Sequence, residues 1–407
     1  MQNASAYGRW NSPVALVVAG GVVMGLALGI RHVQGLFLLP VTMDRAWSRE
    51  AFGFAIAVQN LVWGLAQPLT GMVADRFGSA RVMAGGIACY ASGIVLMALA
   101  ESPAGFGVSA GLVVGAGLSG TAFGTVYGAL SRLVPPQRRP WALGLAGAIG
   151  GCGQFALVPL AQGLIDGLGW TWALVVLGAA MGAALPLATG FRDAPAAGPG
   201  PRQSLAAALR EAFAHRGFRL LTLGFLACGF QLAFIASHLP AYLMDRGMTA
   251  RDAAAGLAVI ALSNVAGTYW CGHLGGLFRR KNLLSGVYLL RSATMLLFVT
   301  LPLTPASLYV FCAFSGFLWL GTVPLTNGLI SQVFGVRYIA TLFGFVFLGH
   351  QVGSFFGVWL GGYVFDRFRS YDLMWAGAIL IGIVAALLHR PIDDRAIVRV
   401  PAPAGAA

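Results

Sequence analysis

The sequence predicts an all-α membrane protein with twelve transmembrane helices, arranged as two pseudo-symmetric halves of six. The first observation is composition: 58% of the 407 residues are hydrophobic and 10% are charged, whereas soluble domains carry about 25% charged residues. The second is a series of apolar runs of transmembrane length, and the third is an internal repeat. This composition excludes a disordered chain, a coiled coil and a soluble enzyme.

The apolar runs lie between charged residues or between Pro and Gly breaks. We predict transmembrane helices at 13–39, 52–73, 82–100, 105–131, 141–163, 170–190, 219–243, 253–275, 283–302, 306–330, 338–364 and 373–389. A helix needs about 20 apolar residues to cross a bilayer, so twelve use roughly 240 residues and leave short loops. The length of the chain fits this arrangement.

The basic residues set the expected orientation. Eighteen Lys and Arg residues lie in the loops and tails on the side of the N-terminus, and six lie in the loops on the other side. Positively charged loops stay in the cytoplasm. We therefore expect a multi-pass protein of the cell inner membrane with both termini cytoplasmic, and we interpret the net charge of +13 as topology and not as nucleic-acid binding.

One long connection divides the chain. We expect an N-terminal six-helix bundle at 1–190, a cytoplasmic linker at 191–218, and a C-terminal six-helix bundle with a short tail at 219–407. The linker begins with a flexible composition and continues as LAAALREAFAHRG. This second part predicts a short amphipathic surface helix, with Leu205, Leu209 and Phe213 on its apolar face and Arg210 and His215 on its polar face.

The two halves are related in sequence. A shift of 201 residues aligns DRAWSREAFGFAIAVQNL, from Asp44, with DRGMTARDAAAGLAVIAL, from Asp245, without a gap, and it also aligns Gly71 with Gly272. Parallel repeats of six helices imply a pseudo-two-fold axis along the membrane normal. The substrate site is then expected near the middle of the membrane, between the halves.

Two loop motifs carry a family resemblance. GMVADRFGSAR (71–81) resembles the Gly-x-x-x-Asp-Arg-x-Gly-x-x-Arg motif of the major facilitator superfamily, and GGYVFDRFRSYD (361–372) is similar to the signature of these proteins between spans eleven and twelve. GIRHVQGLFLLP, RRPWALGLAGAIGG and RYIATLFGFVFLGHQVGSFFGVWLGG further resemble the monocarboxylate and oxalate/formate porters. One departure is that span eight, SNVAGTYWCG (263–272), lacks the Arg that many of these porters hold there.

The resemblance assigns gating roles to the motif residues, which are Gly71, Asp75, Arg76, Gly78, Arg81 and Asp366. It implies that Asp75 caps a neighbouring helix and pairs with a nearby Arg, which holds the cytoplasmic gate closed in the outward-facing state. A carboxylate at a helix N-terminus contributes about 0.3–1 kcal/mol. The alternative is that Asp75 only orients its loop. In the second repeat, Gly276 stands where Asp75 would be.

The charges inside the spans point to an anionic substrate. None of the 13 carboxylates falls in the middle of a span, whereas Arg31 and Arg291 do. A buried charge costs at least about 2.5–3.5 kcal/mol on insertion scales. A guanidinium with no acidic partner can hold a carboxylate in a bidentate pair. We therefore expect Arg31 to bind substrate or act in a gate, with snorkelling to the outer headgroups as the alternative. For Arg291 we favour a lipid-facing snorkel or helix packing.

Several uncharged polar side chains accompany the arginines. We predict a substrate site from Arg31, His32, Tyr127, Gln154, His238, Asn327, His350 and Gln351. His350 is a candidate proton carrier because the pKa of a histidine is near 6.5, and only one of the neighbours Arg31 and His32 can face the cavity fully. Gln34, Gln59, Asn60 and Asn264 are further polar candidates, and His273 and His389 are expected in solvent at cytoplasmic ends.

Together these observations predict a secondary active transporter of small organic anions, monocarboxylates first. We expect alternating access coupled to protons or to exchange of a counter-anion, since the sequence has no phosphate-binding loop for ATP. An efflux carrier for amphipathic or uncharged compounds is the nearest alternative, and an anion channel or a transporter-like sensor are others. We expect no enzymatic activity, cofactor, metal or nucleic-acid partner, and a monomer in the lipid bilayer.

Overall fold

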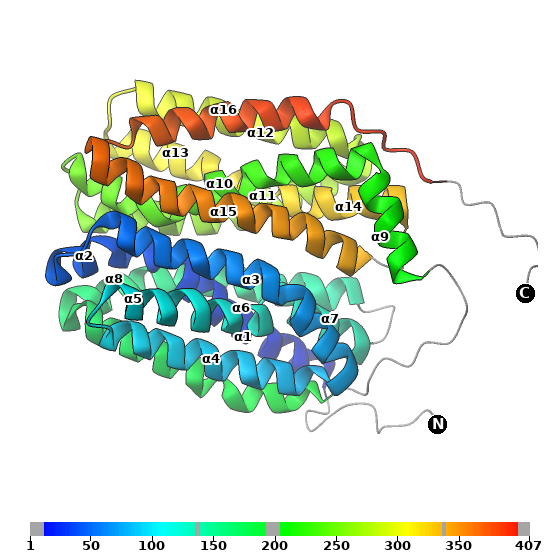
Figure 1. Ribbon diagram of the computed structural model, residues 1–407, viewed down its shortest axis with the longest axis horizontal. Coiled ribbons are helices and arrows are strands. Elements are labelled where there is room, and N and C mark those ends of the chain that lie inside the picture. The colour runs from blue at the N-terminus through cyan, green and yellow to red at the C-terminus, as the bar shows by residue number, and fades with distance from the viewer. Residues whose placement is uncertain (1–11, 135–138, 193–203, 336–338, 398–407) are drawn as a thin grey trace, which may run out of the picture.

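The structure, a computed structural model, describes residues 12–134, 139–192, 204–335 and 339–397. Within these ranges the regular structure is helical and contains no strand. The helices run side by side along the long axis of the molecule (Figure 1). The all-α prediction is therefore confirmed.

The first group of helices lies in the lower part of Figure 1. Its elements are α1 (Pro13–His32), the 3₁₀ turn η1 (Gln34–Phe37), α2 (Leu38–Arg45), α3 (Arg49–Phe77), α4 (Ser79–Leu99), α5 (Pro103–Phe106), the π-helical η2 (Gly107–Val113), α6 (Val114–Thr121), α7 (Phe123–Leu133), α8 (Arg139–Ala183) and the 3₁₀ segment η4 (Leu185–Phe191).

The second group lies above the first in Figure 1. Its elements are α9 (Leu205–Ala214), α10 (Arg216–Asp245), α11 (Ala250–Leu277), α12 (Arg280–Thr300), α13 (Pro305–Phe317), α14 (Thr322–Phe334), α15 (Ile339–Phe368) and α16 (Asp372–His389). The two groups meet chiefly where α3 packs on α15 and where α8 packs on α11.

The helix lengths account for the twelve predicted spans. Ten helical segments are long and apolar enough to cross a membrane by length and composition. One of them, Ala142–Phe191, has 50 residues and turns at Gly169, whose φ of +78° is a conformation that glycine adopts at little cost. This segment therefore holds two spans. The remaining span is the 29-residue helix α3, which is not among these ten segments because it carries more polar side chains than they do.

Breaks interrupt several of the spans in the described part of the chain. The first is interrupted at Val33, between α1 and η1, and the fourth at Ala122, where the backbone becomes extended. The tenth is interrupted between α13 and α14, at 318–321. Such breaks are tolerated inside a membrane protein where other groups satisfy the freed backbone atoms.

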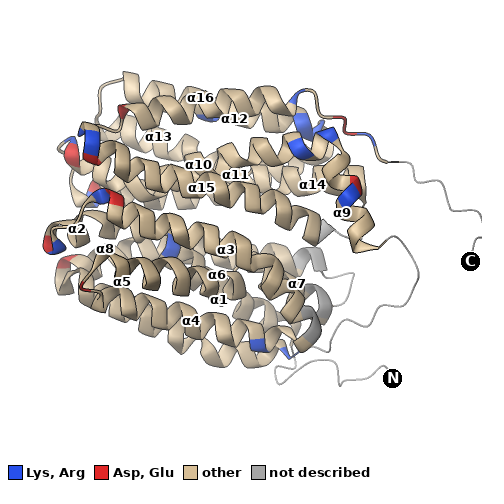
Figure 2. Ribbon diagram, in the orientation of Figure 1, with Lys and Arg blue, Asp and Glu red and all other residues tan. Residues whose placement is uncertain are grey.

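Charged residues gather at the two ends of the bundle (Figure 2). We call one of them the α2 end; it carries Arg49, Asp245 and Asp366. We call the other the α9 end; it carries α9 and Arg279. In a bilayer the charged ends lie in the aqueous and headgroup regions, and the apolar middle lies in the hydrocarbon.

The predicted linker helix is present as α9. Ser204 caps its N-terminus by accepting from the Ala207 N–H, which supplies one of the partners that the first turn lacks. Its buried face consists of Ala208 and Ala212, however, whereas Phe213 is 45% exposed. The Phe213 ring still contacts Phe218 and Phe345, so α9 packs against α10 and α15 by part of its apolar face.

The segment that follows α16, 391–397, packs on the α9 end of the second group. The Asp394 carboxylate accepts from Arg279 Nε at 3.1 Å and from Arg279 Nη2 at 2.6 Å. Lys281 Nζ donates to the Ile392 carbonyl at 2.6 Å, and Gln332 Nε2 donates to the Asp394 carbonyl at 2.8 Å. We call 391–397 the C-terminal segment; it ties the start of α12 to the end of α14.

Candidate functional site

Arg31 lies in the last turn of α1, immediately before the break in the first span. Its Nη2 donates to Asn60 Oδ1 in α3, and its guanidinium lies 5.2 Å from the centre of the Trp63 ring. Its Nε has no hydrogen-bond partner, and among the described residues Arg31 makes no ion pair. The guanidinium is therefore directed toward a neighbouring helix, which does not match the snorkelling alternative.

The partners of Arg31 are themselves held in place. Asn60 Nδ2 donates to the Ile56 carbonyl at 2.9 Å, which leaves Oδ1 free to face Arg31. Trp63 Nε1 donates to Gln67 Oε1 at 2.9 Å. An amide oxygen and an aromatic face stabilise a cation but do not neutralise it, so the positive charge of Arg31 has no described counter-charge.

His32 bonds a different helix from Arg31. Its Nε2 donates to the Leu257 carbonyl of α11 at 3.1 Å, and its side chain is buried. Neighbouring residues of a helix point about 100° apart, which separates the two side chains. Arg31 and His32 therefore have different partners, and which of the two faces a substrate stays a prediction.

His350 and Gln351 lie in the middle of α15. His350 Nδ1 is 3.1 Å from Gln351 Oε1 and 3.4 Å from Ser354 Oγ. The imidazole is parallel to the Phe347 ring, with an interplanar angle of 8° and a centroid distance of 5.6 Å. Gln351 is fully buried, and its Nε2 has no partner. A buried donor without a partner costs about 1–3 kcal/mol and is available to a ligand.

The packing of α3 against α15 brings the two polar groups to the same level. Gln351 is in close contact with Gly64, where an added Cβ would meet Gln351 Cβ at 2.7 Å. Trp63 and Phe347 are in edge contact, with centroids 5.2 Å apart. The structure therefore places Arg31 and Asn60 on one side of this interface and His350 and Gln351 on the other.

Arg291 is buried, with 3% of its surface exposed, and does not face lipid. Its Nε and Nη2 donate to the Leu318 carbonyl at 2.9 and 2.5 Å, and Nη2 also donates to the Trp319 carbonyl. Its Nη1 lies 3.2 Å from Cys228 Sγ. Of the two roles expected for this residue, the lipid-facing snorkel is wrong, and helix packing is the one that the structure shows. Arg291 instead occupies the C-terminal end of α13, where a cation is favoured by the helix dipole and by the free carbonyls of the broken span.

The other predicted binding residues are dispersed. His238 is buried and bonds the Val358 carbonyl at 2.7 Å and the Tyr371 hydroxyl at 3.3 Å, which joins α10 to α15 and α16. Tyr127 is half-buried in α7, Gln154 is buried in α8, and Asn327 is exposed in α14. None of the contacts described for these four side chains involves Arg31 or His350.

The two terminal histidines differ from each other. His273 is exposed, as expected. His389 is fully buried, donates from Nδ1 to the Ala385 carbonyl at 2.7 Å, and stacks on Tyr288. The expectation that His389 lies in solvent is wrong, because α16 packs its last turn on α12 and α10.

The side chains of Asp75 and Arg76 lie outside the described part of the chain. Gly78 ends α3 with a φ of +89°, which is suited to glycine, and an added Cβ at Gly71 would meet no atom within 4 Å. Arg81 is exposed and donates to the Phe77 carbonyl at 3.3 Å.

Asp366 caps a helix of the other group at the α2 end. Its carboxylate accepts from the backbone N–H groups of Arg49 and Glu50, at 3.2 and 2.6 Å. Beside it, Arg49 makes a bidentate pair with Asp245, at 2.6 and 2.7 Å. We call Arg49, Asp245 and Asp366 the α2-end cluster. These contacts join α3 to α10 and α15, and a carboxylate at a helix N-terminus is stabilising.

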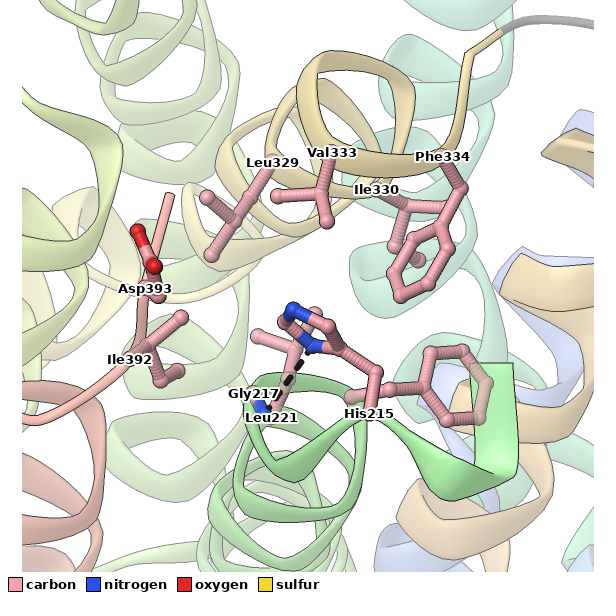
Figure 3. Close-up of a pocket in the computed structure, with 10 residues that line it drawn as sticks. His215, Gly217, Leu221, Leu329, Ile330, Val333, Phe334, Ile392 and Asp393 are labelled. Carbon is pink, nitrogen blue, oxygen red and sulfur yellow. Dashed lines mark hydrogen bonds between the residues drawn. The ribbon is translucent and has the colours of Figure 1, made fainter. Parts of the chain in front are cut away.

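A small apolar pocket lies at the α9 end (Figure 3). It is formed by the start of α10, the end of α14 and the C-terminal segment, with Phe218, Leu329 and Ile392 among its walls. His215 points into it, but His215 Nδ1 already accepts from the Gly217 N–H at 3.1 Å. The pocket offers no convergent set of polar groups, so the candidate site remains the one around Arg31.

Sequence reasoning did not single out Trp63, Phe347 or Cys228. Aromatic residues and cysteine inside apolar runs look like packing residues, and only the pairing of helices shows which of them touch Arg31, His350 or Arg291. Asn60 was one of several polar candidates, and the structure distinguishes it by its contact with Arg31.

The chain has relatives among known proteins. The family model of the Major Facilitator Superfamily matches residues 16–358. Monocarboxylate transporter 11 of Mus musculus is 28% identical over 394 residues, covering 92% of this chain and 86% of that protein. The oxalate:formate antiporter of Oxalobacter formigenes is 23% identical, covering 91% of this chain and 88% of that protein.

A solved structure is also similar. It is a bacterial homologue of the human lysosomal transporter Spinster, in an inward-facing and occupied conformation, with a TM-score of 0.74 and 18% identity over 96% of this chain and 98% of that one. At this identity the likeness shows a shared fold.

Proposed function

The chain belongs to the Major Facilitator Superfamily of membrane transporters, and from that premise we propose that it carries small organic anions, monocarboxylates first, by alternating access. It is a transporter and not an enzyme, like the proteins it resembles. The cargo class rests on one observation above all, the position of Arg31.

Arg31 is a fixed positive charge without a described counter-charge, and its buried Nε–H has no hydrogen-bond partner among the described residues. Asn60 and Trp63 stabilise the guanidinium but carry no charge. A charge at such a depth is costly, and a carboxylate is the ligand that both neutralises the guanidinium and fits its planar fork. Two relatives are named as a monocarboxylate transporter and as an oxalate:formate antiporter, and these names support the same cargo class.

His350 and Gln351 supply the second side of the proposed site. The free Nε2 of Gln351 can donate to the part of the substrate that is distant from Arg31. His350 is our candidate on that side for carrying a coupling proton. Exchange against a second anion would require no protein-borne proton, and we keep both modes within the proposal.

The proposed mechanism uses the two helix groups as moving bodies, with boundaries at 1–190, 191–218 and 219–407. We assign the α9 end to the cytoplasm because eighteen Lys and Arg residues lie in the loops and tails of that side. This places the protein in the cell inner membrane with both termini cytoplasmic. The α2-end cluster then closes the outer side, and Gly71, Asp75, Arg76, Gly78 and Arg81 belong to the inner gate. We propose a monomer as the working unit.

A binding measurement on the purified protein tests the cargo class. A ligand at 100 times its dissociation constant stabilises the folded state by about 2.7 kcal/mol, so thermal unfolding with and without pyruvate, lactate, formate and oxalate reveals which acid binds. We expect at least one acid to raise the unfolding temperature of the wild-type protein, and Arg31→Ala to abolish that rise while Arg31→Lys retains part of it.

Arg246→Ala is the matched control, because Arg246 is exposed at the α2 end and pairs with Asp372. It should respond to the acid as the wild type does. A folded Arg31→Ala protein that binds and transports the acid normally would remove Arg31 from the site. A wild-type protein that is stabilised only by amphipathic cations or uncharged compounds would replace the proposal by the efflux-carrier alternative.

A further inference from the structure

Trp63 and Phe347 meet edge to face at the interface between the two helix groups, with an interplanar angle of 71°. Trp63 follows Asn60 by three residues, and Phe347 precedes His350 by three. With a rise of about 1.5 Å per residue, the aromatic pair lies about 4.5 Å from the level of Asn60 and His350, toward the α9 end. It is therefore the next layer after the proposed substrate site.

On the other side of the site α3 and α15 are in close contact. Toward the α2 end, an added Cβ at Gly53 would meet the Val358 carbonyl oxygen at 2.9 Å, and the Phe54 side chain, which is 46% exposed, contacts the rings of Phe355 and Trp359. Beyond these rings, Trp359 Nε1 donates to Glu50 Oε1, and the α2-end cluster follows. At Gly362 an added Cβ would clash with the Arg49 carbonyl oxygen, so the helices are in backbone contact there.

Toward the α9 end, two described glycines, one in α3 and one in α15, are not in close contact with the facing helix. Gly71 lies two turns beyond Gly64 on the same face of α3, and Gly344 lies two turns before Gln351 on the same face of α15. An added Cβ at either Gly71 or Gly344 would meet no atom within 4 Å, in contrast to the 2.7 Å at Gly64. Pro68 lies between Gly64 and Gly71, and a proline inside a helix permits it to bend.

Each ring of the pair is also attached to a polar group of the site. The Trp63 ring lies under the Arg31 guanidinium, and its Nε1 is anchored on Gln67. The Phe347 ring is parallel to the His350 imidazole. Any widening of the pair must therefore move a ring that bears on Arg31 or on His350.

We propose that Trp63 and Phe347 form the barrier that closes the substrate site toward the α9 end, and that the space this pair yields limits the size of the carboxylate that passes. The inference rests on the proposed function and adds the determinant of substrate size. It follows from the ring contact between Trp63 and Phe347 on the α9 side of Arg31 and from the close packing of α3 on α15 on the α2 side. A cargo that is longer than a small acid requires a larger displacement of Phe347.

Counterflow in proteoliposomes tests the barrier. Pyruvate and phenylpyruvate carry the same 2-oxo acid head and differ by one phenyl ring, so the ratio of their rates isolates size. We expect Phe347→Ala to raise the phenylpyruvate-to-pyruvate ratio about tenfold or more, in the range by which pocket size discriminates between substrates. Phe347→Leu should raise it less, and Phe347→Trp should lower it. Trp63→Phe should raise it as well.

Phe343→Ala is the matched control. Phe343 lies one turn before Phe347 in α15, toward the α9 end. Its described ring contacts are with Phe225 and Phe347 and not with a ring of α3. The phenylpyruvate-to-pyruvate ratio of Phe343→Ala should stay within twofold of the wild-type ratio. An equal rise in Phe343→Ala would show general loosening of α15 and would overturn the barrier.

The outcomes separate the two levels of the proposal. A wild-type protein that carries neither acid nor any other carboxylate overturns the proposed function and the barrier with it. A wild-type protein that carries pyruvate, with a ratio unchanged in Phe347→Ala and Phe347→Trp, overturns the barrier alone. If Phe347→Ala does not fold, the opposite shifts expected for Phe347→Leu and Phe347→Trp still decide the question.

Discussion

The C-terminal segment offers a prediction whose size and sign follow from the structure. Asp394 is 6% exposed and accepts two hydrogen bonds from Arg279, whose side chain is largely exposed. An exposed partner keeps an ion pair weak, but bidentate geometry places this one near the upper limit for such pairs, which corresponds to about a fivefold change in an equilibrium constant. Asp394→Asn should therefore raise the fraction of time that the segment is detached about fivefold.

Hydrogen exchange measures this detachment directly. The Ile397 N–H donates to the Val333 carbonyl at 3.0 Å, so it exchanges only when the segment opens. We expect its protection factor to fall about fivefold in Asp394→Asn and in Arg279→Gln, and the double variant to fall little further because both remove the same pair. Asp393→Asn is the control: Asp393 is exposed and accepts only from the Arg395 N–H.

The ion pair between Asp394 and Arg279 also predicts how attachment of the C-terminal segment depends on pH. The hydrogen bonds and charge of Arg279 hold the pKa of Asp394 below its ordinary value of 3.8. A carboxyl with a lowered pKa stabilises the folded form above its unfolded pKa, and this contribution is lost as the pH falls through the folded pKa. The protection factor of Ile397 should be flat from pH 8 to pH 5 and should fall only below about pH 4. Asp394→Asn protection equal to that of Asp393→Asn, or a fall between pH 8 and pH 5, would refute this reasoning.

Three further predictions concern the helix groups. Arg291→Gln should lower the free energy of unfolding by about 3 kcal/mol, because it leaves buried carbonyls without their donor; chemical denaturation checks this, and a loss under 1 kcal/mol would contradict the role at the break in span ten. Asp366→Asn should weaken the helix cap and widen the α2 end, seen as a longer distance between spin labels at the exposed residues Met43 and Met244; an unchanged distance distribution would count against closure by this residue. His350→Gln should flatten the dependence of uptake on external pH between 5 and 8 if this side chain carries the coupling proton; an unaltered slope would assign the proton to the substrate or favour anion exchange.

The twelve helices could be predicted because length and apolarity decide whether a helix crosses a bilayer. The breaks at Val33, Ala122 and 318–321 could not. Each lies within an apolar run, and the one in span ten is stabilised from a distance by Arg291, which sits in a different helix. A break in a membrane-spanning helix is tolerated only where another residue satisfies the freed backbone groups. The sequence alone does not show which residues are in contact.

The candidate site was predicted to the extent that it depends on charge. Arg31 stands out because a cation inside a membrane-spanning run is energetically costly and is usually kept for a function. His32 and His238 each bond a backbone carbonyl, those of Leu257 and Val358, which a polar side chain near the centre finds as readily as a ligand; their part in the site stays a prediction. Trp63 lacked any signal in the sequence, since its role depends on which helix it faces.

The counterpart of the first loop motif in the second repeat, around Gly276, lacks the acidic residue, and another part of the chain supplies an acid for its cations. Gly276 stands where Asp75 does in the first copy, and the loop that follows carries three consecutive cations at 279–281 without an acid. In the structure the C-terminal segment supplies the acceptors: the Asp394 carboxylate for Arg279 and the Ile392 carbonyl for Lys281. The middle cation, Arg280, donates to Gln332, whose own Nε2 donates to the Asp394 carbonyl. The acid absent from the loop is thus supplied by a segment more than a hundred residues away, which a comparison of the two repeats alone could not show.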